Sequence, residues 1–339
     1  MTASVSASTS FLLRRRLLGA CAAAPFASLA SIAALGFATA PRGALAADLA
    51  SVTLVLGDQA GGMRALTEAA KVLDGAPYRY RWANFQGAAP LFEAQRANAV
   101  DIAPAGDLPV LAAATGDPSL RIVATRVGSP TQLGLLVPQD SPIRSVAELK
   151  GRTIAVSSAR GSISEFQLYG ALAEAGLSRR DVNVRYILPV DAFAAFASGA
   201  LEVWATFDPY YGIAVSRGAR VLRDGTGINT GLNFITASGA AHADPLKRAA
   251  IADVLVRIQH AGQWALANPQ AYARVYGTLT RTPDAAALTI TQRSALRLRF
   301  VTGDDVAALQ RVADKAVDDG ILPRRIDVRA VSDTQIGAV

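Results

Sequence analysis

Residues 52–73 read VTLVLGDQAGGMRALTEAAKVL, a β-rich run followed by a Gly-rich loop and a helical run. Residues 52–56 are β-branched or aliphatic, which favours a strand. Residues 64–73 contain mainly strong helix formers and predict a helix. The loop at 57–62 joins the two directly. A strand that leads through a short loop into a helix is the building unit of α/β folds.

The same order of elements continues along the chain. Further strands are predicted at residues 78–82, 102–105, 122–126, 133–137, 153–156, 182–186 and 203–207, with helices at 90–97 and 108–115. Ser145 with Glu148, and Ser162 with Glu165, fit the capping box that opens a helix. The residues that follow Pro245 are mostly helical in composition.

Two runs of alternating strands and helices predict a two-lobed α/β protein, each lobe a mostly parallel sheet flanked by helices. The stretches 128–132 and 231–234 are the predicted crossings between the lobes. We therefore expect lobe I to comprise residues 47–129 and 234–339, and lobe II residues 130–233. A ligand cleft is expected between the lobes.

Residues 1–46 have the three parts of an export signal. The consecutive Arg14, Arg15 and Arg16 precede a long Ala/Leu-rich stretch, and the small residues of 44–46 supply a cleavage site. Consecutive arginines are typical of the twin-arginine route. We predict a twin-arginine signal peptide that is removed before Ala47, and a mature protein in the periplasm. An N-terminal membrane anchor is the alternative.

Removal of this signal changes the charge and the chemistry of the chain. The whole sequence has 34 basic and 27 acidic residues, a net charge of +7. Residues 1–46 hold four of the arginines and no acid, so the remainder has 30 basic residues against 27 acidic ones, a net charge of +3. No dense basic run remains, which argues against nucleic acid as a partner. Cys21, the only cysteine, leaves with the signal. We therefore expect neither disulfides nor thiol chemistry.

The predicted strands share one feature at their carboxyl ends. Several of them run into a polar or Gly-rich loop that opens directly into a helix, at residues 57–62, 84–89, 106–107, 157–162 and 208–209. The carboxyl ends of parallel strands face one crevice, where ligands bind. Helix N-termini favour anions there. The loops therefore predict a cleft for a small anionic ligand.

Three charged residues stand out in these loops. Arg160 precedes a predicted helix and could pair with a sulfonate, sulfate or carboxylate, or it could be a solvated surface residue. Asp107 and Asp208 could bind an amine, but each precedes apolar helix residues, so capping is the preferred interpretation. Trp204 lies within a strand and is expected in the core.

The sequence contains little that indicates an enzyme. No nucleophile elbow, zinc-protease or P-loop motif is present. The two histidines, His242 and His260, lie outside the five loops. We expect no catalytic residues, no metal and no cofactor. The alternative is a periplasmic hydrolase or lyase that uses Asp107 and Asp208 as a carboxylate pair.

Several segments resemble one family, the periplasmic substrate-binding proteins of ABC importers for aliphatic sulfonates, taurine and nitrate. The similarity runs from about residue 52 to 237. It is carried by residues 140–151 (DSPIRSVAELKG), by 188–192 with 198–200, by 105–109 (AGDLP), and by Trp204 with the Asp-Pro-Tyr of 208–210.

The resemblance implies a type II periplasmic-binding-protein fold that closes on its ligand and docks to an inner-membrane permease. By position, the ligand loops of the family fall on Gln59, Phe85, Gly106, Asp107, Ser158, Gly161, Ser162 and Asp208, and Arg160 joins this predicted set from its own chemistry. The implied ligand is a small anionic organosulfur compound, an aliphatic sulfonate. Nitrate, taurine and other small anions are alternatives, and a monomer is expected. A sensory rather than a transport role also stays open.

Overall fold

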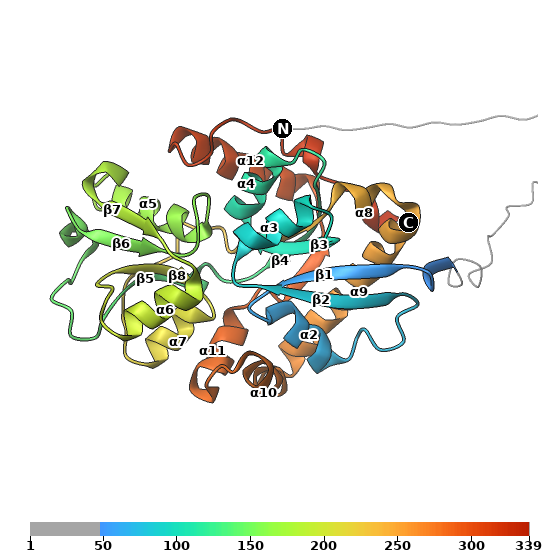
Figure 1. Cartoon of the computed structure of the whole chain (residues 1–339), viewed down its shortest axis with the longest axis horizontal. Helices are drawn as coiled ribbons and strands as arrows, with labels where there is room; N and C mark the ends of the chain where they lie inside the picture. Colours follow the sequence, from blue (N-terminus) through green and yellow to red (C-terminus); the bar gives the residue numbers. More distant parts are fainter. Residues whose placement is uncertain (1–47, 339) are drawn as a thin grey trace, which may run out of the picture. The chain divides into compact units, whose positions relative to one another are not determined.

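The computed structural model describes residues 48–338 (Figure 1). The predicted signal peptide lies outside the described residues. Within residues 48–338 the strands form two separate sheets, one of six strands and one of five. None of the helices in this part of the chain is both long and apolar enough to cross a membrane.

The first sheet is built from both ends of the described chain. Its strands, in spatial order, are β11 (Arg297–Phe300), β4 (Arg121–Val127), β10 (Leu232–Ala237), β3 (Ile102–Gly106), β1 (Thr53–Gln59) and β2 (Arg79–Phe85). β1 pairs in parallel with β2 and β3. β10 is antiparallel to both β3 and β4, and β11 is antiparallel to β4.

The second sheet contains only the middle of the chain. Its order is β7 (Asn183–Tyr186), β6 (Thr153–Val156), β8 (Trp204–Phe207), β5 (Leu133–Val137) and β9 (Arg220–Asp224). β6 is parallel to β7 and β8. β5 is antiparallel to β8 and β9.

The two-lobed α/β architecture is confirmed, but the prediction of mostly parallel sheets is wrong, because both sheets are mixed. Apart from β11, the antiparallel pairings involve strands next to the points at which the chain changes sheet. β5 follows the first crossing, β9 and β10 flank the second, and each lies antiparallel to its neighbours. β9, β10 and β11 are not among the predicted strands. The lobe limits stay a prediction, and the limit at residue 234 falls inside β10.

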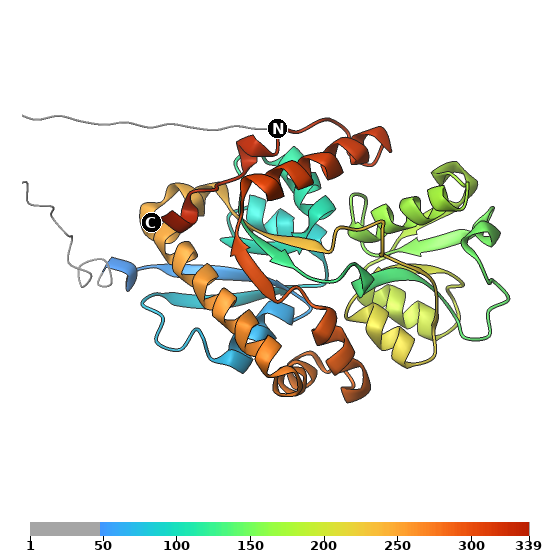
Figure 2. The same cartoon turned by 180° about the vertical axis from the view of Figure 1, so that it is seen from behind.

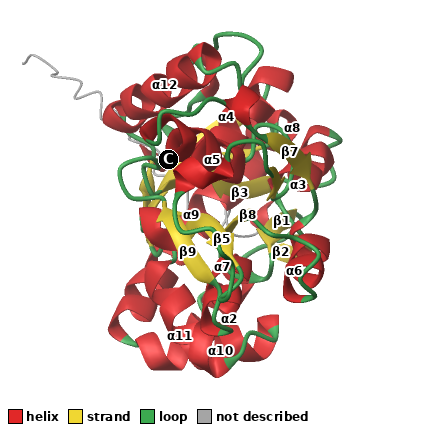
Figure 3. Cartoon of the chain, turned by 90° about the vertical axis from the view of Figure 1, so that its left-hand side faces the viewer, coloured by secondary structure: helices red, strands yellow, loops and turns green. Residues whose placement is uncertain are grey.

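Helices cover both faces of each sheet, as the red ribbons around the yellow strands in Figure 3 show. In a strand, neighbouring side chains point to opposite faces. Leu54 and Leu56 of β1 therefore pack with α2 (Gly62–Ala70), α9 (Pro245–Ala267) and α10 (Pro269–Thr280). Val55 faces the opposite core. Figure 2 shows α9 in orange and α12 (Gly303–Asp318) in red from behind.

The opposite core of the first sheet contains α3 (Ala88–Arg96), α4 (Asp107–Gly116) and α12. In the second sheet, Leu135 packs toward α5 (Ile163–Glu174), and Leu136 packs toward α6 (Pro189–Ala197) and α7 (Tyr210–Ser216). Trp204 is fully buried and its indole N–H donates to Ser157 Oγ at 2.9 Å, which confirms its predicted core position. The remaining helices are α8 (Gly239–Ala243) and α11 (Asp284–Arg293).

The two predicted capping boxes have different outcomes. Ser162 is the N-cap of α5, and its Oγ accepts the Glu165 N–H at 3.3 Å. The Glu165 carboxylate does not return to Ser162, because it accepts the Gly161 N–H at 2.7 Å instead. The prediction of a helix opened by a capping box at Ser145 is wrong. That serine precedes only the short 3₁₀ turn η2 (Val146–Leu149), and its hydroxyl donates directly to Glu148 Oε1 at 2.8 Å.

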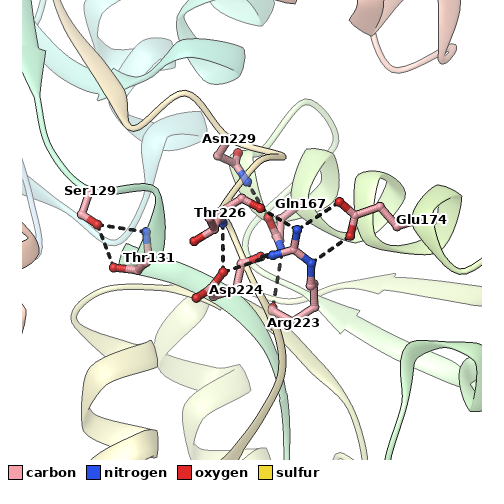
Figure 4. A network of polar contacts seen from close by, with 8 residues as sticks. All are labelled: Ser129, Thr131, Gln167, Glu174, Arg223, Asp224, Thr226 and Asn229. Carbon is pink, nitrogen blue, oxygen red and sulfur yellow. Dashed lines mark hydrogen bonds and ion pairs between the residues drawn. The ribbon is translucent and has the colours of Figure 1, made fainter.

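The two crossings between the sheets lie against each other. The Gly128 N–H donates to the carbonyl of Gly231 at 3.0 Å. Figure 4 shows the polar network that holds the second crossing on the second sheet. Asn229 Nδ2 donates to Gln167 Oε1 at 2.5 Å, and Arg223 forms two contacts with Glu174 at 2.8 and 3.0 Å. The start of the second crossing is thereby tied to α5.

Candidate functional site

A cavity of about 170 Å³ lies where loops from both sheets meet. The first sheet contributes residues at the ends of β1, β3 and β4, and the second contributes the loops that follow β6 and β8. Tyr272 and Tyr276 of α10, with Ile290 of α11, close another side. Ligands bind at the carboxyl ends of strands in such folds, and this cavity, called the main pocket below, lies there.

Five of the nine predicted site residues line the main pocket: Gln59, Gly106, Ser158, Ser162 and Asp208. The structure brings these together from four separate loops. Their contact with a ligand remains a prediction.

The other four predicted residues lie elsewhere. Phe85 packs against the core of α3 and α4. Asp107 is buried outside the pocket lining, and its carboxylate accepts the Thr230 hydroxyl at 2.7 Å, so it anchors the second crossing. Burial raises the pKa of Asp107. Arg160 and Gly161 line a neighbouring cavity rather than this one.

Arg126, near the end of β4, is the site residue that the sequence analysis missed. It lines the main pocket, and its guanidinium makes no ion pair or hydrogen bond with any residue of 48–338; its Nε is buried without a partner. Burial lowers its pKa, while Tyr272 and Asp58 act in the opposite direction. The Arg126 side chain is half-buried, and a cation that is partly removed from water without a partner is costly, so this one is suited to an anionic ligand. The signal in the sequence is a lone arginine in the apolar run IVATRV at 122–127.

Asp58, at the end of β1, is the second pocket residue that was not singled out. Its carboxylate accepts the backbone N–H groups of Gln59, Met63 and Arg64 at 2.8, 2.9 and 3.1 Å. It therefore caps the N-terminus of α2, the positive end of the helix. Burial raises the pKa of Asp58 to about 6, although these hydrogen bonds and Arg126 oppose the rise.

Asp208 connects the second sheet to α11 through a bidentate ion pair with Arg293. Arg293 Nε and Nη2 donate to its two carboxylate oxygens at 3.0 and 2.9 Å. The Gly212 N–H in the first turn of α7 donates to the same carboxylate at 2.9 Å. Burial raises the pKa of Asp208 to about 7, against the opposing effect of Arg293. The structure does not bring Asp107 and Asp208 together in the main pocket.

Three glycines allow the loops of the two sheets to approach closely. A Cβ added at Gly87 would lie 3.0 Å from Ser158 Oγ, and one at Gly106 would lie 2.8 Å from Ile163 Cδ1. A Cβ at Gly161 would lie 3.0 Å from that of Ala112. Any larger side chain at these positions would push the pocket walls apart. Because they lack a Cβ, these glycines allow the loops of the two sheets to close around the pocket.

Residues 72–260 match the family described as ABC transporter, phosphonate, periplasmic substrate-binding protein. This match covers more than half of the chain. The chain belongs to this family of periplasmic binding proteins. It is also 31% identical over 256 residues to an Escherichia coli (strain K12) protein named for aliphatic sulfonate binding, covering 73% of this chain and 77% of the relative.

Solved structures agree with this assignment. The alkanesulfonate-binding protein SsuA from Xanthomonas axonopodis pv. citri, bound to MOPS, is 28% identical and superposes with a TM-score of 0.76, covering 83% of this chain and 98% of that one. A mutant of the desulfurization enzyme DszB, solved with biphenyl-2-sulfinic acid, has a TM-score of 0.60 at 18% identity, covering 84% of this chain and 97% of that one. The second likeness shows the fold alone, so the fold is shared by binding proteins and by an enzyme.

Proposed function

We propose that this protein is the solute-binding component of an ABC importer and captures an aliphatic sulfonate in the main pocket. The observation that carries the proposal is the unpaired guanidinium of Arg126, which is half-buried and lines a pocket whose walls come from both sheets. Guanidinium groups bind oxyanions through charge-assisted, paired hydrogen bonds. The sulfonate-binding relatives support the same ligand class.

The charges around the pocket favour a singly charged anion. Arg293 neutralises Asp208, whereas the carboxylate of Asp58 lowers the positive potential around Arg126 without forming an ion pair with it. A sulfonate then brings one net negative charge into the pocket, whereas a doubly ionised phosphonate brings two. Net charge is expensive in a poorly solvated site, so the sulfonate is preferred.

The apolar walls favour an organic sulfonate over the alternative anions. Met63, Pro104, Ile163, Phe207 and Ile290 all line the pocket and can contact an alkyl chain. Nitrate has no apolar part to bury against them. Taurine carries an ammonium group that needs a free carboxylate, and both carboxylates of the pocket already have partners.

The proposal includes capture without a covalent step. Neither a histidine nor a cysteine is among the pocket residues described, and Asp208 is tied to Arg293. Export by the twin-arginine route, delivery of the ligand to a membrane permease, and action as a monomer complete the proposal. The arginines at 14–16 support the export route.

Calorimetry on purified mature protein tests the function. We expect alkanesulfonates of two to six carbons to bind with micromolar or tighter affinity, about −8 kcal/mol or better, and to raise the melting temperature. Carboxylates and phosphonates of the same chain length serve as matched controls, together with nitrate. Mass spectrometry of the incubated mixtures should detect no product. Tighter binding of nitrate or phosphonates, or turnover of a sulfonate, would contradict the proposal.

The pH dependence of binding is a separate prediction. Below about pH 6 Asp58 takes up a proton, so the negative charge beside Arg126 disappears while a sulfonate stays ionised. Affinity should therefore rise as the pH falls from 8 to 5, by roughly three- to tenfold. Asp208 contributes in the same direction as it protonates near pH 7. Titrations at several pH values measure this, and Asp58→Asn should flatten the step near pH 6. An affinity that falls on acidification would refute the charge balance described above.

A further inference from the structure

A second cavity, of about 180 Å³, lies beside the main pocket. The two cavities share Ala88, Pro109, Ser158 and Ser162 as wall residues. The shared residues come from α3 and α4 on one side and from the loop after β6 on the other. These residues lie between the two cavities, so a ligand that reaches from the main pocket into the second cavity, which we call the side chamber, has to pass between them.

One wall of the side chamber is apolar apart from Glu93, and the opposite wall carries Arg160. Phe92 and Ala112 belong to the helices of the first sheet, and Arg160 to the loop of the second. The guanidinium of Arg160 lies 5.9 Å from the centre of the Tyr186 ring and forms no ion pair or hydrogen bond with the described residues. Glu93, the acidic residue of this chamber, already pairs with Arg96. Arg160 is therefore the charged residue of the side chamber that has no ion-pair partner among the described residues, and its charge is positive.

We propose that the main pocket and the side chamber form one ligand site, in which Arg160 selects sulfonates that carry a second anionic group at their far end. This inference rests on the proposed function. Arg126 holds the sulfonate, the apolar wall contacts the carbon chain, and Arg160 pairs with a terminal carboxylate. The preferred ligand class is then an ω-sulfocarboxylate rather than a plain alkanesulfonate.

The arrangement favours a carboxylate over an ammonium group at the far end. Arg179 and Arg180 line a third cavity that also includes Arg160, so they add to the positive potential on the outer side. Arg179 Nη1 donates to the Gly320 carbonyl at 3.1 Å, and Arg160 has no such acceptor. Because Arg160 is exposed, its charge acts through solvent, and its effect on affinity is moderate.

Three sulfonates of equal chain length test the inference: one with a methyl end, one with a carboxylate end and one with an amine end. The series is repeated for chains of three to six carbons by calorimetry at low salt. We expect the wild-type protein to bind the best carboxylate about three- to fivefold more tightly than its methyl counterpart, and the amine least well. In Arg160→Ala the preference for carboxylate should vanish, and in Arg160→Glu it should reverse toward the amine.

The control is Arg180→Ala, which removes a nearby positive charge that does not line the side chamber. This variant should keep the preference for carboxylate. An equal loss in Arg180→Ala and Arg160→Ala would overturn the inference, because general electrostatic attraction would then explain both. A wild-type preference ratio of one at every chain length would also overturn it while leaving the proposed function intact. If none of the sulfonates binds, the proposed function and this inference fall together.

Discussion

Replacing Arg126 with methionine is expected to abolish most of the affinity for alkanesulfonates, with a loss of roughly 30-fold to several thousandfold. Loss of one partner of a buried, hydrogen-bonded charge pair costs about 2–5 kcal/mol, and about 1.4 kcal/mol corresponds to tenfold in affinity. The unliganded variant should be as stable as the wild type or more so, because methionine removes a half-buried charge that has no partner among the described residues. Calorimetry and thermal melting of the same samples measure both effects.

Arg121 supplies the matched control, since it lies at the other end of the same strand. Its Nη1 donates to the carbonyls of Pro118, Ser119 and Leu120 at 2.8–2.9 Å, and it does not line the main pocket. Arg121→Met should therefore bind sulfonate as the wild type does. Wild-type affinity in Arg126→Met would show that the ligand anion is held elsewhere. Unfolding of that variant would instead show that Arg126 has a structural role.

Replacing Arg293 with leucine is expected to destabilise the protein by about 3–5 kcal/mol at pH 8 and by much less at pH 5. The substitution leaves the buried carboxylate of Asp208 without its cation, and such orphaned charges are strongly destabilising. The loss of stability depends on pH because a protonated Asp208 carries no charge and does not need the cation. Urea unfolding at both pH values measures the difference.

The sign of this pH dependence follows from the raised pKa of Asp208. The folded wild type binds this proton up to about pH 7, whereas the unfolded chain releases it near 3.8, the ordinary pKa of an aspartate. Stability from this group therefore falls as the pH rises between those values. Without Arg293 the pKa of Asp208 in the folded protein rises further. The stability that this group contributes therefore keeps falling as the pH rises above 7. At pH 5 both proteins hold the proton, and the difference shrinks.

The double variant Asp208→Asn/Arg293→Leu separates charge from packing. It removes the carboxylate that causes the pH dependence, so its stability relative to Asp208→Asn should differ little between pH 5 and pH 8. Equal losses in Arg293→Leu at both pH values would contradict the charge argument. They would indicate instead that the contact of Arg293 with the Tyr211 ring, 5.1 Å away, carries the effect.

Within the candidate site, the sequence predicted which loops line the pocket but did not predict the roles of the two arginines, Arg126 and Arg293. Gln59, Gly106, Ser158, Ser162 and Asp208 were predicted from strand-end loops, and all line the pocket. Arg126 was missed because it lies inside a strand, where a single arginine has the same local pattern whether it faces a pocket or solvent. The partner of Asp208 was missed because Arg293 lies 85 residues further along the chain.

The sequence by itself determined the two-lobed α/β class, the strands up to residue 207 and the loops that form the pocket. These follow from local propensity, apolar patterning and turn chemistry, which act over a few neighbouring residues. Only the tertiary structure decided the antiparallel placement of β5, β10 and β11, the unpaired state of Arg126 and the position of Arg160 in a separate chamber. Those features depend on which distant segments meet, and local patterns do not specify long-range pairing, burial or the presence of a counter-charge.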